Sequence, residues 1–149
     1  MRALLVVVFA GCVVQGTDGS GGWVFPDGTA GHCQSDSSCT GGKVCARDGG
    51  CWSPSEVHSA HVSWTLRGMP ASPTTCEATP DLQIGFYPKS MTTQELGYAP
   101  VPCALGKFTV DKLPVTYTGV KLGRAVSDHR WESATIDGVT GEATLDLPL

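Results

Sequence analysis

Apolar and polar side chains alternate along much of the chain after residue 57. Successive side chains of an extended strand point to opposite faces, so this alternation predicts strands with one buried face. The residues expected to share that face are Val62, Trp64, Leu66, Leu82, Ile84, Phe86, Phe108, Val110, Tyr117, Ile136, Leu145 and Leu147. Short strands of this kind predict an all-β fold, an antiparallel β-sandwich, over residues 57–149.

The alternation changes phase within one of these segments. Val115 and Tyr117 begin a strand on one parity, whereas Val120 and Leu122 lie on the other. Gly119 stands between the two pairs and predicts a β-bulge that resets the phase.

Turns and breaks are expected at three further places. Asp137, Gly138 and Gly141 separate the last two strands, and their turn chemistry predicts a hairpin. Ser90–Gly97 lacks the alternation, and its Thr-x-x-Glu pattern predicts a single helical turn. The Ser-Pro-Ser sequence at residues 53–55 is expected to form a short hinge.

The N-terminus carries a different pattern, an unbroken apolar run over Ala3–Ala10 after one basic residue. This pattern predicts a signal peptide over residues 1–11, and the run is too short to span a bilayer. The sequence Phe9-Ala10-Gly11-Cys12 resembles the lipobox of bacterial lipoproteins, which implies a lipid on Cys12. The alternative is cleavage after Gly16, which would release a free protein. A Gly-, Ser-, Thr- and Asp-rich tether completes the segment 12–31.

Four evenly spaced cysteines define the next segment, residues 32–53. Five residues separate each cysteine from the next, and no C-x-x-C pair of the kind used by zinc sites occurs. The block also has little apolar content from which to build a core. Four cysteines allow three pairings. We expect Cys33–Cys45 and Cys39–Cys51, because interleaved bridges cross-link the whole block, whereas neighbouring pairs leave two separate loops.

Cys76 and Cys103 are the only cysteines of the predicted sandwich, so they are expected to form a third disulfide. Cys12 is either lipidated or removed with the signal peptide, which leaves six cysteines to pair. Disulfides persist in oxidising compartments. The cysteine content therefore predicts a protein outside the cytoplasm.

Two stretches resemble known families. The pattern C-x-x-D-x-x-C-x-G-G-x-x-C, from Cys33 to Cys45, resembles Dickkopf-type cysteine-rich motifs of secreted proteins and implies an extracellular interaction module. A structural spacer without a partner is the alternative. The sequence of Gly106–Val120, G-K-F-T-V-x-x-L-P-V-T-Y-x-x-V, resembles transthyretin-like and carboxypeptidase-regulatory-like domains. That resemblance implies a β-sandwich and a surface location rather than a reaction.

Candidate catalytic and metal-binding residues have simpler structural explanations. His58 and His61 form H-x-x-H, but residues three apart on a strand face opposite sides, which argues against a shared metal. Asp128, His129 and Glu132 are expected to lie in a solvated polar loop. The aromatic side chains that could stack on a sugar, Trp131 and Tyr98, are expected to pack in the core.

Together these observations predict a protein that is not an enzyme and uses no cofactor. A net charge of −4 and the absence of a basic stripe argue against nucleic acid as a partner. The leading hypothesis is a surface-anchored lipoprotein of the cell envelope, attached to the membrane through its N-terminal lipid, with a structural or protein-binding sandwich. Val13 after the lipidated cysteine favours the outer membrane. The alternatives are a freely secreted binding or inhibitor protein and, third, a small hydrolase with an unrecognised site.

Overall fold

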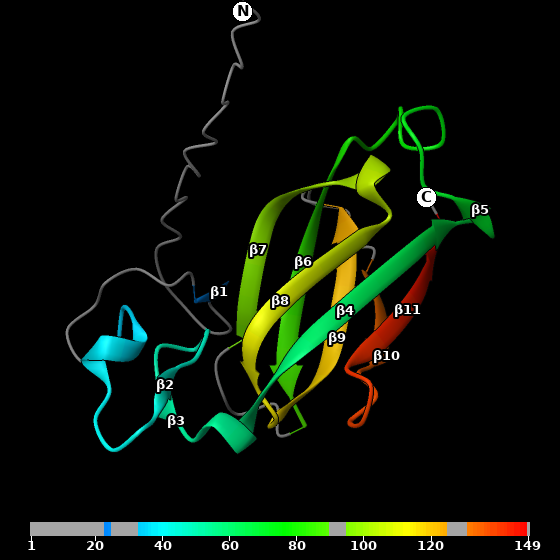
Figure 1. The fold of residues 1–149 in the computed structure, drawn as a ribbon. Coiled ribbons are helices and arrows are strands. Elements are labelled where there is room, and N and C mark those ends of the chain that lie inside the picture. Colours follow the sequence, from blue (N-terminus) through cyan, green and yellow to red (C-terminus); the bar gives the residue numbers. More distant parts are fainter. Residues whose placement is uncertain (1–22, 25–32, 90–94, 125–130, 149) are drawn as a thin grey trace, which may run out of the picture.

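The computed structural model describes residues 23–24, 33–89, 95–124 and 131–148, and it shows two β-sheets packed face to face beside a small cysteine-rich module (Figure 1). The first sheet has the strand order β1-β7-β6-β9-β10. Its strands are β1 (Trp23–Val24), β7 (Glu95–Pro102), β6 (Asp81–Pro88), β9 (Tyr117–Arg124) and β10 (Trp131–Thr135).

The second sheet is built around the longest strand, β4 (Val57–Leu66), which pairs with three others. Its partners are β11 (Glu142–Leu147), β8 (Lys107–Pro114) and the short β5 (Met69–Pro70). A two-stranded hairpin, β2 (Val44–Cys45) with β3 (Cys51–Trp52), belongs to the module. Three 3-10 helices complete the described elements: η1 (Asp36–Ser38), η2 (Pro54–Glu56) and η3 (Cys103–Leu105).

The hydrophobic core fills the space between the two sheets and confirms the all-β prediction. Of the residues expected on the inward face, all but Phe108 are buried. Phe108 is half-buried and still packs on the core, with its ring centroid 5.2 Å from that of Tyr98 and 6.3 Å from that of Phe86. Period-two alternation therefore identified the inward face of these strands correctly.

The β-bulge expected near Gly119 is present in β9. Pro88 of β6 pairs with Tyr117, whereas the preceding Tyr87 pairs with Gly119, so β9 contributes one extra residue. Val120 lies on the inward face after this change of phase and is fully buried. Glycine is also required for space, because a Cβ at position 119 would lie 2.2 Å from the ring of Tyr87. The expectation for Val115 was wrong, since it precedes β9 and is 45% exposed.

The expected hairpin between the last two strands is also wrong. β10 pairs with β9, and β11 joins the other sheet, where it runs parallel to β4. Asp137 does form the expected tight turn, because its Oδ1 accepts the backbone N–H groups of Val139 and Thr140 at 2.8 Å each. These bonds hold the pKa of the Asp137 carboxyl below its usual value. The turn thus reverses the chain locally but passes it from one sheet to the other.

Strand β7 was not expected from the sequence. Glu95–Gly97 are its first residues rather than part of a helical turn, and residues 90–94 lie outside the described part of the chain. Pro100 and Pro102 interrupt the segment, and proline is normally a signal against a strand. Both are exposed, and β7 pairs antiparallel with β6 on one side, while β1 pairs only with Glu95 and Leu96 on the other.

The predicted disulfide of the sandwich is present. Cys76 and Cys103 are bonded, with Cα atoms 5.8 Å apart, and both are buried. The Nε1 of Trp64 donates a hydrogen bond of 2.9 Å to the carbonyl oxygen of Cys103. The disulfide therefore fixes the segment before β6 to the start of η3 at one end of the core.

Candidate functional site

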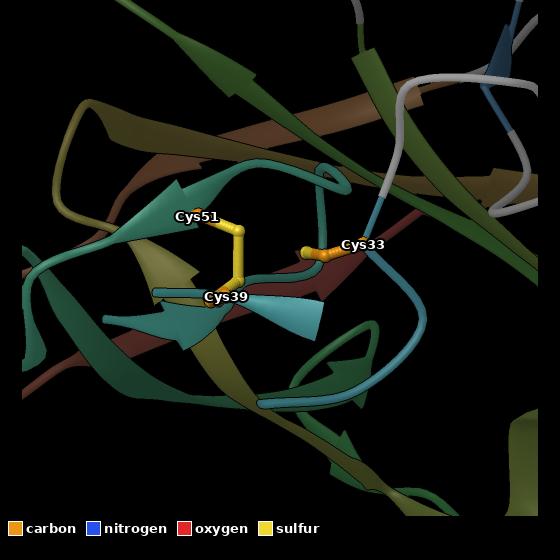
Figure 2. Close-up of side chains that lie close together, drawn as sticks. All are labelled: Cys33, Cys39 and Cys51. Carbon is orange, nitrogen blue, oxygen red and sulfur yellow. A yellow bond between two sulfur atoms is a disulfide. The ribbon is translucent and has the colours of Figure 1, made fainter. Parts of the chain in front are cut away.

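The cysteine-rich module has the interleaved disulfides expected from its spacing. Cys33 is bonded to Cys45 and Cys39 to Cys51, with Cα atoms 5.6 Å apart in each pair. The sulfur atoms of Cys33, Cys39 and Cys51 lie within 4.8 Å of one another (Figure 2). Metal ligation by cysteine needs free thiolates. Since each of these sulfurs is held in a disulfide, the cluster offers none in this state.

Charged side chains connect the module to β8 of the sandwich. The guanidinium of Arg47 donates to Asp111 Oδ1, with Nε at 2.9 Å and Nη2 also in contact. The backbone N–H of Arg47 donates to the carbonyl oxygen of Lys112 at 3.1 Å. In return, Lys112 Nζ lies 2.8 Å from both carboxylate oxygens of Asp36. Contacts therefore cross the boundary in both directions.

These contacts favour the ionised carboxylates. The hydrogen bond from Lys112 lowers the pKa of Asp36, and that from Arg47 lowers the pKa of Asp111. Asp36 Oδ1 also accepts the backbone N–H of Cys45 at 3.0 Å. The bridges are about half exposed, so solvent and salt screen them. They orient the module more than they stabilise it.

Residues 53–55, which were expected to form a hinge, are instead held in place by hydrogen bonds. Ser53 and Glu56 form a capping box around η2, in which Glu56 Oε2 accepts the backbone N–H of Ser53 at 3.0 Å. The carbonyl oxygen of Glu56 accepts the N–H of Val115 at 2.9 Å. These bonds therefore fix the backbone of the segment that connects the module to β4.

A polar depression of 530 Å³ lies where the β2–β3 hairpin meets η2. Its described lining consists of Lys43, Asp48, Gly49, Gly50, Cys51, Trp52 and Glu56. The sequence patterns did not indicate this site. The Asp-x-x-x-Trp spacing is a weak signal, because only the hairpin brings Asp48 and Trp52 together.

The indole of Trp52 is fixed within the depression. Its Nε1 donates to Asp48, with Oδ1 at 3.0 Å and Oδ2 at 3.1 Å, and the same Oδ1 accepts the N–H of Gly50 at 2.9 Å. A Cβ at Gly50 would lie 2.6 Å from the indole Nε1, so the close approach of the ring requires glycine there. The pairing of Val44 with Trp52 fixes the backbone from which the ring projects.

A cation, Lys43, and a carboxylate, Glu56, line the same depression. Hydrogen bonds from the backbone and side chain of Ser53 lower the pKa of Glu56, and the positive charge of Lys43 adds to the effect. The depression thus combines an aromatic surface, an ammonium group and ionised oxygen acceptors.

The two candidate histidines do not converge. His58 is half-buried on β4, burial lowers its pKa, and its Nε2 has no hydrogen-bond partner among the described residues. His61 is exposed, with Nδ1 3.2 Å from Thr109 Oγ1. Asp128 and His129 lie outside the described residues, as does Cys12, whereas Glu132 is half-buried on β10.

The two aromatic residues considered for sugar stacking are also separated. Tyr98 belongs to the aromatic cluster at the core, where burial raises its pKa. Trp131 lies on β10, with its ring centroid 5.0 Å from Lys121 Nζ. They do not form one binding surface, because Tyr98 is on β7 and two strands separate it from β10.

No family model, curated protein or solved structure matches this chain. The resemblances to Dickkopf-type motifs and to transthyretin-like domains therefore stay predictions. Within the described residues, no helix is both long enough and apolar enough to cross a membrane.

Proposed function

We propose that this chain is a non-catalytic lipoprotein of the bacterial cell envelope, in which the sandwich carries a structural or protein-binding role outside the cytoplasm. The observation that carries the proposal is the pairing of all six described cysteines into three disulfides. Such bridges persist in an oxidising compartment and are rare in the cytosol. The lipobox-like sequence ending at Cys12 supplies the anchor.

The arrangement of titratable groups supports binding rather than catalysis. General acid–base chemistry needs a proton donor and acceptor within hydrogen-bond reach of one reacting atom. On β4, His58 is half-buried whereas His61 is exposed, so the two side chains do not converge. The described lining of the depression includes no histidine. Ordered contacts between the module and β8 favour a fixed surface presented to a partner.

The anchor is tested by expressing the native chain and the Cys12→Ser variant in a bacterial host. The native protein is expected in the detergent phase, with acylated Cys12 as the first residue in mass spectrometry. The variant is expected in the soluble or uncleaved fraction, because a single attachment point carries the lipid. A soluble native protein that begins at Thr17 would contradict the anchor and support the freely secreted alternative.

The non-catalytic role is tested with esterase, glycosidase and peptidase substrates on the oxidised protein. No turnover above buffer is expected. Activity that disappears in His58→Ala, His61→Ala or His129→Ala would contradict the proposal and support the hydrolase alternative.

A further inference from the structure

We propose that the depression on the cysteine-rich module binds a neutral saccharide, with a sugar ring against Trp52 and its hydroxyl groups on Lys43 and Glu56. The inference goes beyond the proposed function by naming a ligand class and the residues that contact it. It rests on the proposed function only in requiring that the module faces the outside of the cell.

Trp52 is positioned before any ligand arrives. Asp48 accepts its Nε1 through both carboxylate oxygens, and Gly50 allows the edge of the ring to approach the backbone. Trp52 is half-buried and is one of the residues that line the depression. A fixed apolar surface lowers the ordering cost of binding. It suits a ligand with a flat apolar face, such as the C–H face of a sugar ring.

Lys43 and Glu56 provide hydrogen-bonding groups of opposite kind on the same depression. An ammonium group only donates, and an ionised carboxylate only accepts. Glu56 is held ionised by its bonds to Ser53 and by the charge of Lys43, which lowers its pKa. A hydroxyl group both donates and accepts, so a ligand with neighbouring hydroxyls can satisfy both side chains at once.

Charged ligands fit this depression less well. One ammonium and two carboxylates line it, so a phosphate or another polyanion would face net repulsion. A cationic side chain would be attracted by the excess carboxylate, but it would also face Lys43 and would find the Asp48 oxygens engaged by Trp52 and Gly50. The volume of 530 Å³ lies within the range of small-molecule sites, roughly 300–1,000 Å³.

The disulfide state controls this site. Cys51 lines the depression and is bonded to Cys39, and the β2–β3 pairing that presents Trp52 lies between the interleaved bridges. Reduction would free both strands of the hairpin. Saccharide binding is therefore expected only of the oxidised protein.

The test is a titration of the oxidised, ¹⁵N-labelled full-length chain with chitotriose, maltotriose and mannotriose, followed by NMR. The chain has four tryptophans, and the indole N–H signal missing from Trp52→Phe assigns that of Trp52. At least one of these sugars is expected to shift this signal in the millimolar range. Trp52→Ala, followed through the backbone amide signals of the module, should weaken binding by about tenfold or more, because a central aromatic contact is lost.

Lys43→Ala keeps the test decisive if Trp52→Ala fails to fold, because the Lys43 side chain is exposed. It should weaken saccharide binding several-fold, whereas Lys107→Ala, an exposed lysine on β8, should leave it unchanged. Inorganic phosphate and tetralysine serve as charged competitors. A Trp52 signal that responds only to phosphate or tetralysine, or to none of the sugars, overturns the inference.

The lipoprotein and saccharide proposals can fail separately. A soluble protein without a lipid that still binds a sugar through Trp52 would contradict the anchor alone. An anchored protein whose Trp52 signal ignores all three sugars would contradict the saccharide site alone.

Discussion

The cysteine-rich module and the β-sandwich are both ordered, but they reach that order by different routes. Within the module, Ala46 is the only buried apolar side chain among residues 33–53, and two interleaved disulfides connect its segments. The sandwich buries apolar side chains from both of its sheets in one continuous cluster. It carries a single disulfide, at one end.

This difference separates two sources of stability. Burial of apolar area stabilises a region in proportion to its core, and a short cysteine-rich block has little area to bury. A disulfide instead restricts the unfolded chain and can stabilise a region without a core. Changes to the core should therefore affect the sandwich, whereas changes to the interleaved bridges should affect the module.

The largest effect is expected from Trp64→Ala in the sandwich. Trp64 is 3% exposed, and its Nε1 donates to the carbonyl oxygen of Cys103, so truncation leaves a cavity and removes a buried hydrogen bond. The free energy of unfolding should fall by about 3–5 kcal/mol in chemical denaturation. Val115→Ala is the matched surface control and should change it by less than about 0.5 kcal/mol. Equal effects of the two changes would contradict the role of the core.

A somewhat smaller effect is expected from the double variant Cys33→Ser, Cys45→Ser. Loss of this bridge should destabilise the module by about 2–4 kcal/mol. Amide hydrogen exchange should rise across residues 33–52 while the buried amides of β4 and β6 keep their protection. Loss of protection in β6 to the same extent would show that the two regions unfold as one unit.

A third change addresses the contact between the regions. Arg47→Ala removes the salt bridge to Asp111. The side chain of Arg47 is 47% exposed and that of Asp111 is 54% exposed. Because solvent screens this pair, the free energy of unfolding should fall by only about 0.2–1 kcal/mol, and less at high salt. Lys107→Ala, which changes another exposed charged residue on the strand that carries Asp111, β8, provides the control. A decrease several times larger would show that the module stabilises the sandwich rather than only docking on it.

The smallest effect on the free energy of unfolding is expected from a change of pH. It should arise in the sandwich, where His58 lies on β4. Burial lowers the pKa of His58 below the ordinary value of 6.5, so the unfolded chain takes up a proton more readily than the folded one. Stability should therefore be complete above the unfolded pKa and fall as the pH drops through that value. His58→Gln should remove this dependence between about pH 7 and 5.5, and His61→Gln should retain it. A wild-type unfolding midpoint that stays constant over this range would contradict the burial of His58.

Local sequence patterns by themselves determined much of the sandwich. Alternation assigned the inward face of β4, β6 and β11, because side-chain direction repeats every two residues within a strand. Gly119 marked the bulge in β9 for a local reason, since a bulge has to form within a few residues. The even spacing of the four module cysteines likewise led to the observed pairing.

The tertiary structure alone decided which segments become neighbours. The turn at Asp137 could not reveal that β11 pairs with β4, because turn chemistry sets a local reversal and not the choice of sheet. Likewise, Arg47 and Asp111 form a salt bridge although they are 64 residues apart in the sequence. Such contacts depend on how distant segments close around a shared core, and short-range sequence patterns carry little information about that closure.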